Sequence, residues 1–164
     1  MKHKTEIIAE AGSHDLFIRR AFDAPVTKVF QAFTNPDLLI RWFMPPEQEL
    51  RVVAFDCRTS GQFQLKQKGG DDQEYGFYGV FHEVTAPSLI VRTSEFQGLP
   101  QKLEPVLEFT RFLETGNGTL VEIHSICPSV EYRDQMINAG MKPTLEVTHS
   151  LLDKLLQSPM ITVQ

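Results

Sequence analysis

The sequence predicts an α+β fold in which a curved antiparallel sheet wraps around one long C-terminal helix. Two patterns carry this prediction: apolar residues alternate with period two through the middle of the chain, and they return at spacings of three and four near its end. Turn residues separate the alternating segments at short intervals, which is typical of strands that follow one another in an antiparallel sheet. A helix that follows such a sheet buries its apolar stripe by lying across the concave face.

One strand and two short helices are expected at the start of this order. The segment SHDLFIRRAF alternates and precedes an Ala-Pro turn, where the proline favours the first turn of a helix. Residues 26–34 and 36–43 carry apolar side chains at helical spacing, and Asn35 provides a cap for the second segment. Helices this short cannot bury their aromatic side chains alone. We therefore expect a lid at residues 26–43 that closes one end of the sheet and moves when a ligand enters.

Six more strands and two more helices complete the predicted order. The strands are expected at residues 49–58, 62–68, 75–84, 88–96, 102–114 and 119–127. Pro105 indicates that its strand begins irregularly or lies at a sheet edge. A short helix is expected at residues 130–140, ended by Gly140, and a longer one at residues 142–157 with one apolar stripe.

The composition excludes several classes of protein. The 164 residues carry a net charge of −5 and the basic residues form no stripe, so we expect no nucleic-acid partner. No apolar run approaches the roughly 18 residues that span a bilayer, and no signal-peptide core is visible, so we expect a cytoplasmic protein without membrane insertion. Cys57 and Cys127 lack the spacing of a metal or redox motif. Reduced thiols, no metal and no cofactor are therefore expected.

No linker or repeat divides the chain, so we expect a single domain at residues 13–158. Residues 1–12 are expected to form a flexible N-terminal lead, and residues 159–164 a C-terminal tail. The sequence is compatible with a monomer or a homodimer, the latter through an outer strand face.

Motifs along the chain resemble those of a known superfamily. RAFDAP is followed by VF-x-AFT-x-P-x-L-x-x-RWF-x-P, and then by DCRTSG at residues 56–61, in which Ser60 replaces a glycine. GVFHEVTAPSLI at residues 79–90 and the later GNGTLVEI continue the series. In order and spacing, this set resembles the START-like superfamily, also called SRPBCC or birch-pollen-allergen-like, over residues 14–157. More narrowly, it resembles the branch related to activators of the ninety-kilodalton heat-shock protein ATPase.

The resemblance implies the helix-grip fold, a seven-stranded antiparallel sheet that grips a long C-terminal helix around a cavity. Members of the superfamily bind lipids, hormones and polyketides, some cyclise aromatic precursors, and some contact chaperones. We therefore expect a small hydrophobic or amphipathic molecule as the partner. Two alternatives are a chaperone-regulating interaction module and a pocket enzyme of the polyketide cyclase/dehydratase type. The sequence holds no GxSxG or HExxH motif, and we assign no catalytic residue.

The expected ligand-binding residues are those that strand alternation, the lid and the helical stripe place around the cavity. Twelve phenylalanines against three tyrosines predict an apolar interior with few polar anchors. The residues are Phe33, Trp42, Phe43, Phe55, Cys57, Phe63, Leu65, Phe77, Gly79, Phe81, Phe109, Arg111, Ile123, Met141, Leu145 and His149.

Each of these residues also has a structural interpretation. Any one phenylalanine either fills the core or lines a cavity, and Trp42 and Phe43 either cap the core or line its entrance. His149 is either a hydrogen-bonded structural residue or a functional one. Arg111 depends on the strand register: on the inner face it clamps a ligand carboxylate or phosphate, and on the outer face it is solvated.

Overall fold

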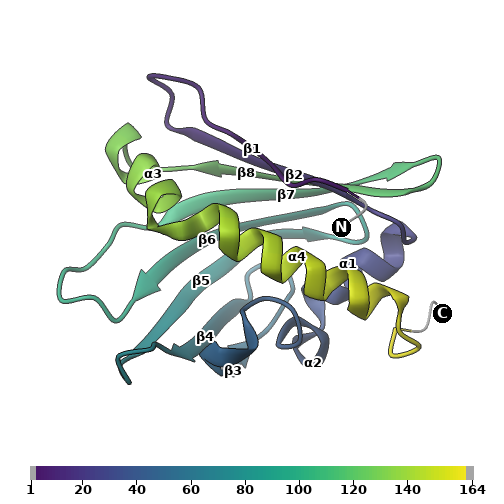
Figure 1. The fold of residues 1–164 in the computed structure, drawn as a ribbon, viewed down its shortest axis with the longest axis horizontal. Helices are drawn as coiled ribbons and strands as arrows, with labels where there is room; N and C mark the ends of the chain where they lie inside the picture. Colours follow the sequence, from purple (N-terminus) through teal and green to yellow (C-terminus); the bar gives the residue numbers. More distant parts are fainter. Residues whose placement is uncertain (1–2, 162–164) are drawn as a thin grey trace.

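An eight-stranded antiparallel sheet curves around a C-terminal helix across residues 3–161, the part of the chain that this computed structural model describes (Figure 1). The strands are β1 (Glu6–Ile8), β2 (Asp15–Phe22), β3 (Arg51–Phe55), β4 (Gln62–Lys68), β5 (Glu74–Thr85), β6 (Leu89–Gln97), β7 (Val106–Thr115) and β8 (Gly118–Ile126). Their order across the sheet is β1-β2-β8-β7-β6-β5-β4-β3. Because β2 pairs with β8, strands from the two ends of the chain lie side by side. The predicted α+β helix-grip architecture is confirmed.

Helices cover the concave face and close one end of the sheet. α1 (Val26–Thr34) and α2 (Pro36–Leu39) follow β2, and a short 3-10 helix at Pro46–Gln48 precedes β3. After β8, α3 (Val130–Met136) continues through a π-helical turn at Ile137–Met141 into α4 (Lys142–Gln157). α4 crosses the concave face, and α1 packs beside its C-terminal half (Figure 1).

The helix ends follow the predicted signals. The Asn35 side chain accepts a hydrogen bond from the backbone N–H of Asp37 at 2.9 Å, which caps α2. Gly140 has a φ of 96°, a left-handed conformation suited to glycine, and it separates α3 from α4 where a break is predicted. α2 ends at Leu39 rather than at residue 43, because the chain turns and the Trp42 indole N–H donates to the Ala32 carbonyl at 2.9 Å.

The N-terminal residues differ from the prediction. Residues 6–8, which lie in the predicted N-terminal lead, pair with β2 as strand β1, so the sheet has eight strands instead of seven among the described residues. Ile7 lies opposite Ile18, and the Thr5 side chain is buried. A strand of three residues is too short for a period-two pattern to predict it.

The register decides which face of the sheet is inner. On the inner face Val121 lies between Arg20 and Phe112, and both of its neighbours are buried. The core runs from the lid across this face to the C-terminal half of α4, where Leu152, Leu155 and Leu156 are buried. β7 begins at Val106 in the middle of the sheet, so Pro105 marks an irregular start and not an edge.

Within residues 3–161, no helix combines the length and apolar character needed to span a bilayer.

Candidate functional site

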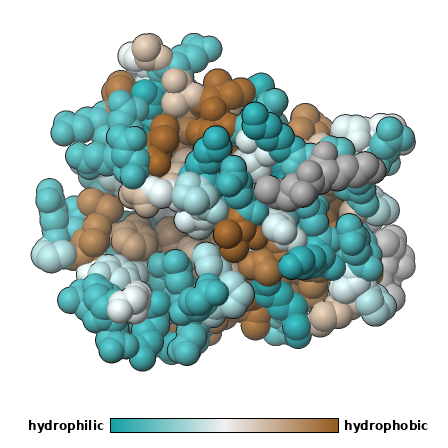
Figure 2. Space-filling model, in the orientation of Figure 1, coloured by the Kyte–Doolittle hydropathy of each residue, from teal (hydrophilic) through white to brown (hydrophobic). Residues whose placement is uncertain are grey.

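The inner side of the fold is filled near the lid and more open away from it. Phe63, Leu65 and Phe81 are fully buried on this face. Farther along the same face, Phe77 of β5 and Phe96 of β6 are half-buried, as are Met141 and Leu145 before and in the first turns of α4. Figure 2 shows a hollow beside the N-terminal half of α4, with hydrophobic residues at its base and hydrophilic residues around its rim. We use the name inner groove for the half-buried part of the inner side that carries Phe77, Phe96, Met141 and Leu145.

A continuous row of aromatic rings joins the lid to the inner groove. Neighbouring ring centroids lie between 4.6 and 6.0 Å apart, within the range of favourable ring–ring contacts. In order, the row consists of Phe33, Trp42, Phe43, Phe77, Phe96 and Tyr75. Its lid end is fixed in the core by the buried Trp42, and its other end is half-exposed. The row therefore forms an apolar wall that extends from the core to solvent.

An ion pair lies on the same inner face as this wall. Arg92 Nε donates to Glu108 Oε2 at 2.7 Å, and the guanidinium lies 4.8 Å from the centre of the Phe63 ring. The two charged side chains are only 20% and 18% exposed. Gly79 leaves room for the Phe63 ring because it has no side chain. A Cβ at residue 79 would lie 2.7 Å from that ring and 1.9 Å from the Thr93 carbonyl oxygen.

Cys57 contributes to the same side of the fold. Burial raises the pKa of its thiol to about 11, although the positive charge of Arg92 acts in the opposite direction. The thiol is therefore protonated near neutral pH and is a weak nucleophile. It adds polarizable lining and no negative charge that would compete for Arg92.

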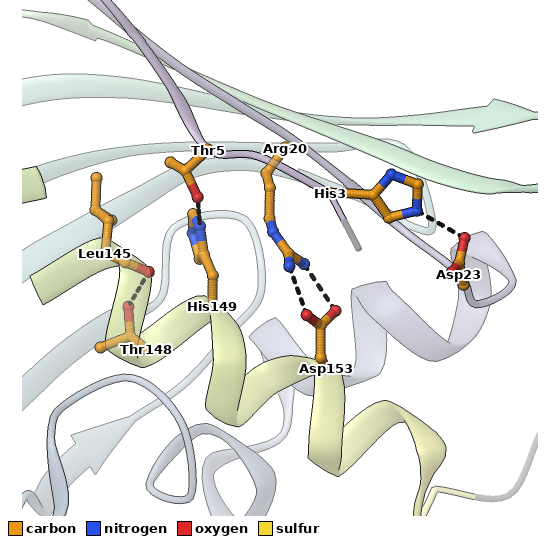
Figure 3. A network of polar contacts seen from close by, with 8 residues as sticks. All are labelled: His3, Thr5, Arg20, Asp23, Leu145, Thr148, His149 and Asp153. Carbon is orange, nitrogen blue, oxygen red and sulfur yellow. Dashed lines mark hydrogen bonds and ion pairs between the residues drawn. The ribbon is translucent and has the colours of Figure 1, made fainter. Parts of the chain in front are cut away.

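A second polar network joins α4 to the N-terminal strands (Figure 3). Arg20 of β2 donates from both terminal nitrogens to the two carboxylate oxygens of Asp153, at 2.7 and 2.5 Å. One turn earlier on α4, His149 Nδ1 lies 2.8 Å from the hydroxyl oxygen of Thr5. Burial, together with the charge of Arg20, lowers the pKa of His149 to about 4, and Asp153 opposes this shift. His149 is thus a neutral, hydrogen-bonded residue that ties α4 to the N-terminal segment.

Most of the predicted ligand-binding residues lie on the inner side of the fold. Those placed there by register, burial or helical spacing are Phe33, Trp42, Phe43, Phe55, Cys57, Phe63, Leu65, Phe77, Gly79, Phe81, Ile123, Met141, Leu145 and His149. Several of them fill the closed end, and only some border the inner groove. That these residues bind a ligand remains a prediction.

Two predicted residues, Phe109 and Arg111, lie on the outer face. The register places Phe109 opposite His124 and Arg111 opposite Glu122, and all four side chains point away from α4. Arg111 is 40% exposed, lies 3.7 Å from Glu122 and stacks over the Phe109 ring. It therefore cannot clamp a ligand inside the fold.

On the outer face around Arg111, side chains of neighbouring strands contact one another in successive rows. The His124 ring stacks between Phe17 and Phe109, with ring centroids 4.3 and 5.8 Å away. In the next row Glu122 accepts from Arg19 Nε at 2.7 Å. This cluster stabilises the outer side of three neighbouring strands and forms no part of the inner groove.

Comparison with known protein families supports this architecture. The profile of the family described as Activator of Hsp90 ATPase homolog 1-like protein matches residues 23–157. The chain belongs to this family. The predicted superfamily and its narrower branch are both confirmed.

Solved structures with the fold of this Hsp90-activator-like family come from several bacteria. Protein Ms6760 from Mycobacterium smegmatis aligns with a TM-score of 0.84 at 23% identity, covering 98% of this chain and 100% of that one. A Rhodobacter sphaeroides protein aligns with a TM-score of 0.83 at 21% identity, covering 93% and 98% of the two chains. An Arthrobacter aurescens protein gives 0.82 at 21% identity, covering 97% and 95%. At these identities the likeness shows the fold alone. A search of curated proteins found no match.

Sequence reasoning missed the polar pair and part of the aromatic wall. Arg92, Ser94 and Phe96 alternate in the predicted strand at residues 88–96, and Glu108 lies in the neighbouring strand. The available signal was that Arg92 shares a strand face with the apolar Phe96, and that the oppositely charged Glu108 lies in the next strand. Only the register shows that this face is inner.

Two surface clefts lie elsewhere on the molecule. One, of about 240 Å³, is lined by His3, Asp23, Ser150, Asp153, Lys154, Leu156 and Gln157. The other, of about 260 Å³, is lined by Glu49, Arg51, Lys66, Gln67, Lys68, Asp72 and Glu74. Both are lined mainly by polar side chains, and neither includes a residue of the aromatic row. In the described part of the chain, no group of three or more potential metal ligands gathers.

Proposed function

We propose that this member of the Hsp90-activator-like family binds a small amphipathic molecule in the inner groove. The observation that carries the proposal is the half-exposed aromatic wall of Phe77, Phe96 and Tyr75, which continues from the core and shares the inner face with the Arg92–Glu108 pair. Apolar walls with few polar anchors are typical of sites for small hydrophobic molecules. Burial of the ligand's apolar part would contribute roughly 25 cal/mol per Å².

The closed end of the fold favours access from the groove side. Val29 and Ala32 of α1 have no exposed surface, so opening the lid would expose the core. The groove instead reaches solvent beside α4. Ligand access therefore needs no movement of residues 26–43, in contrast to the moving lid expected from the sequence.

The first experiment identifies a bound molecule and then blocks its site. Native mass spectrometry of the purified protein, with analysis of its organic extract, detects a co-purifying ligand. Leu145 lies one helical turn before the buried Thr148 and His149, so Leu145→Trp is expected to fill the groove. Val147 is 46% exposed on the opposite side of α4, so Val147→Trp is the matched control.

The expected result is loss of the bound mass, and of the melting-temperature increase with dodecanol, in Leu145→Trp alone. Equal behaviour of both variants, or no ligand and no thermal shift in the unmodified protein, would refute the proposal. A cytoplasmic location is part of the same proposal, and fractionation of cells that produce the protein tests it.

A second candidate function, chaperone regulation, is favoured by the outer face. Leu113 and Ile126 are 45% and 39% exposed, and the register places both on the same outer face as the Phe17–His124–Phe109 stack. The family description refers to activators of the Hsp90 ATPase. If this face binds the chaperone, Leu113→Asp lowers any stimulation of Hsp90 ATPase activity, and Leu145→Trp does not.

A further inference from the structure

We propose that Arg92 anchors the ligand through a single carboxylate, so that the inner groove selects amphipathic monocarboxylates, such as fatty acids, over neutral molecules of the same length. This inference rests on the proposed function and names the ligand's chemical class. The anchoring role that the sequence suggested for Arg111 passes to Arg92, because the register places Arg92 on the inner face and Arg111 on the outer face.

The Arg92 guanidinium is only partly used by the protein. Its Nε donates to Glu108, whereas neither terminal nitrogen, Nη1 or Nη2, has a hydrogen-bond partner among residues 3–161. Neither nitrogen is among the fully buried unpartnered atoms of this region, so both reach solvent. Arg20 shows the opposite arrangement, because Asp153 takes both of its terminal nitrogens and its Nε is buried without a partner.

The orientation of Arg92 is fixed by its neighbours. Glu108 holds Nε from one side, and the Phe63 ring lies under the guanidinium plane at 4.8 Å. The two terminal N–H groups therefore form a preoriented fork, which matches the two oxygens of a carboxylate. Lysine cannot replace this geometry because its ammonium group is a single point charge.

Among anionic ligands, the charge balance favours a monoanion over a dianion. Glu108 already neutralises one positive charge at 2.7 Å, so a ligand carboxylate leaves the three groups with one net negative charge. A dianionic phosphate would add a second negative charge in a partly buried place, where repulsion is weakly screened. The protonated Cys57 thiol adds no charge of its own.

The apolar tail has a path from this anchor. Arg92, Ser94 and Phe96 share the inner side of β6, and four residues of strand span about 13 Å. Ser94, opposite Gly79, is the small residue between the anchor and the aromatic wall. An acyl chain that leaves Arg92 along β6 therefore reaches Phe96 and Phe77.

The test compares dodecanoate with dodecanol, which differ only in the head group. Arg92→Gln combined with Glu108→Gln removes both charges, so no unpaired charge stays behind. Arg92→Lys keeps the charge and loses the fork. Arg111→Gln is the matched control, since Arg111 also faces a glutamate but on the outer side of the sheet. Dissociation constants come from titration calorimetry, and far-UV circular dichroism checks that each variant is folded.

The unmodified protein and Arg111→Gln are expected to bind dodecanoate about tenfold more tightly than dodecanol. The double variant and Arg92→Lys are expected to lose that preference while they keep their affinity for dodecanol. If dodecanol binds and dodecanoate binds no more tightly, or if the preference survives in Arg92→Lys, the Arg92 anchor is wrong and the proposed function stands. If the unmodified protein binds neither molecule, the proposed function fails as well. Arg92→Lys decides the question should the double variant not fold.

Discussion

At the scale of single residues, His149 shows how burial determines a role. Its ring lies edge-on to Phe22, with centroids 5.7 Å apart, and its Nδ1 contacts the Thr5 hydroxyl. The charged groups that face it are Arg20, which opposes protonation, and Asp153, which favours it. Burial is the largest effect, so the neutral ring is the form that the folded protein stabilises.

Acid is therefore expected to weaken the fold through His149. Its pKa falls from an ordinary 6.5 to about 4 in the folded protein, so the unfolded chain takes up this proton first as the pH falls. Stability is full above the unfolded value and declines between the two values. From about pH 7 to about pH 5 the loss of unfolding free energy due to this group is about 2 kcal/mol.

Urea unfolding at these two pH values measures the effect. His149→Gln is expected to be less stable at neutral pH and to show a smaller change between the two conditions. His82→Gln, at an exposed histidine, is the control and should change as the unmodified protein does. An unaltered pH dependence in His149→Gln would contradict this assignment.

The two arginines of the sheet show where prediction from sequence stops. Arg92 and Arg111 lie on neighbouring strands, and each alternates with apolar residues. Period two groups the residues that share a face, yet both faces of these strands carry aromatic and aliphatic side chains. Arg111 was the candidate clamp if its face was inner, and the register places Arg111 outside and Arg92 inside. Apart from Phe109, the predicted aromatic residues and the predicted helical residues lie on the inner side, because the inner side holds both the core and the wall of any cavity.

At the scale of elements, the two halves of α4 are buried to different extents. Its C-terminal half packs into the core through Leu152, Leu155 and Leu156, and Arg20–Asp153 fastens the same half to β2. Toward its N-terminal end, the apolar residues Met141, just before α4, and Leu145 are only half-buried. The closed and open ends of the inner side follow from this difference along one helix.

Removal of the Asp153 charge is expected to loosen this attachment. The Arg20 side chain is 1% exposed, so Asp153→Asn leaves a buried guanidinium without its counter-charge and costs about 3 kcal/mol of unfolding free energy. Glu74, which pairs with Arg51 and Lys66 on the surface, is the control, and Glu74→Gln should leave stability nearly unchanged. Chemical denaturation of both variants measures the difference. Equal effects would show that the Arg20–Asp153 pair contributes no more than a surface pair.

The elements themselves could be predicted well, with failures at short segments. All six described strands that follow the lid, and both C-terminal helices, lie where alternation and helical spacing place them. α2 is shorter than predicted because Trp42 reaches back to Ala32, a tertiary contact that local spacing does not contain. β1 is three residues long. It is held in place by pairing with β2 and by the contact of Thr5 with His149, which local sequence patterns do not contain.

At the scale of the whole molecule, the lid, the sheet and α4 share one core. Trp42 contacts Phe33 in α1 and Phe43, and the same buried cluster continues to Leu152 in α4. A domain with one continuous core is expected to unfold in a single cooperative step. Trp42 is the single tryptophan of the chain, so its fluorescence reports on the lid alone.

We therefore expect Trp42 fluorescence and far-UV circular dichroism to give the same midpoint in a urea titration. The first reports the lid, and the second the whole sheet and α4. A fluorescence transition at lower urea would mean that the lid opens as a separate unit. Ligand access through residues 26–43 would then replace access beside α4.

The short strand β1 also bears on whether the sheet edge at β2 can pair with a second copy. β2 has eight residues, and β1 pairs with residues 17–19 in the middle of its outer edge. Without β1, that edge would present unpaired N–H and C=O groups along its length, a template onto which a second copy could add a strand. A truncation or fusion that disturbs residues 3–8 would therefore reduce solubility before it altered the fold.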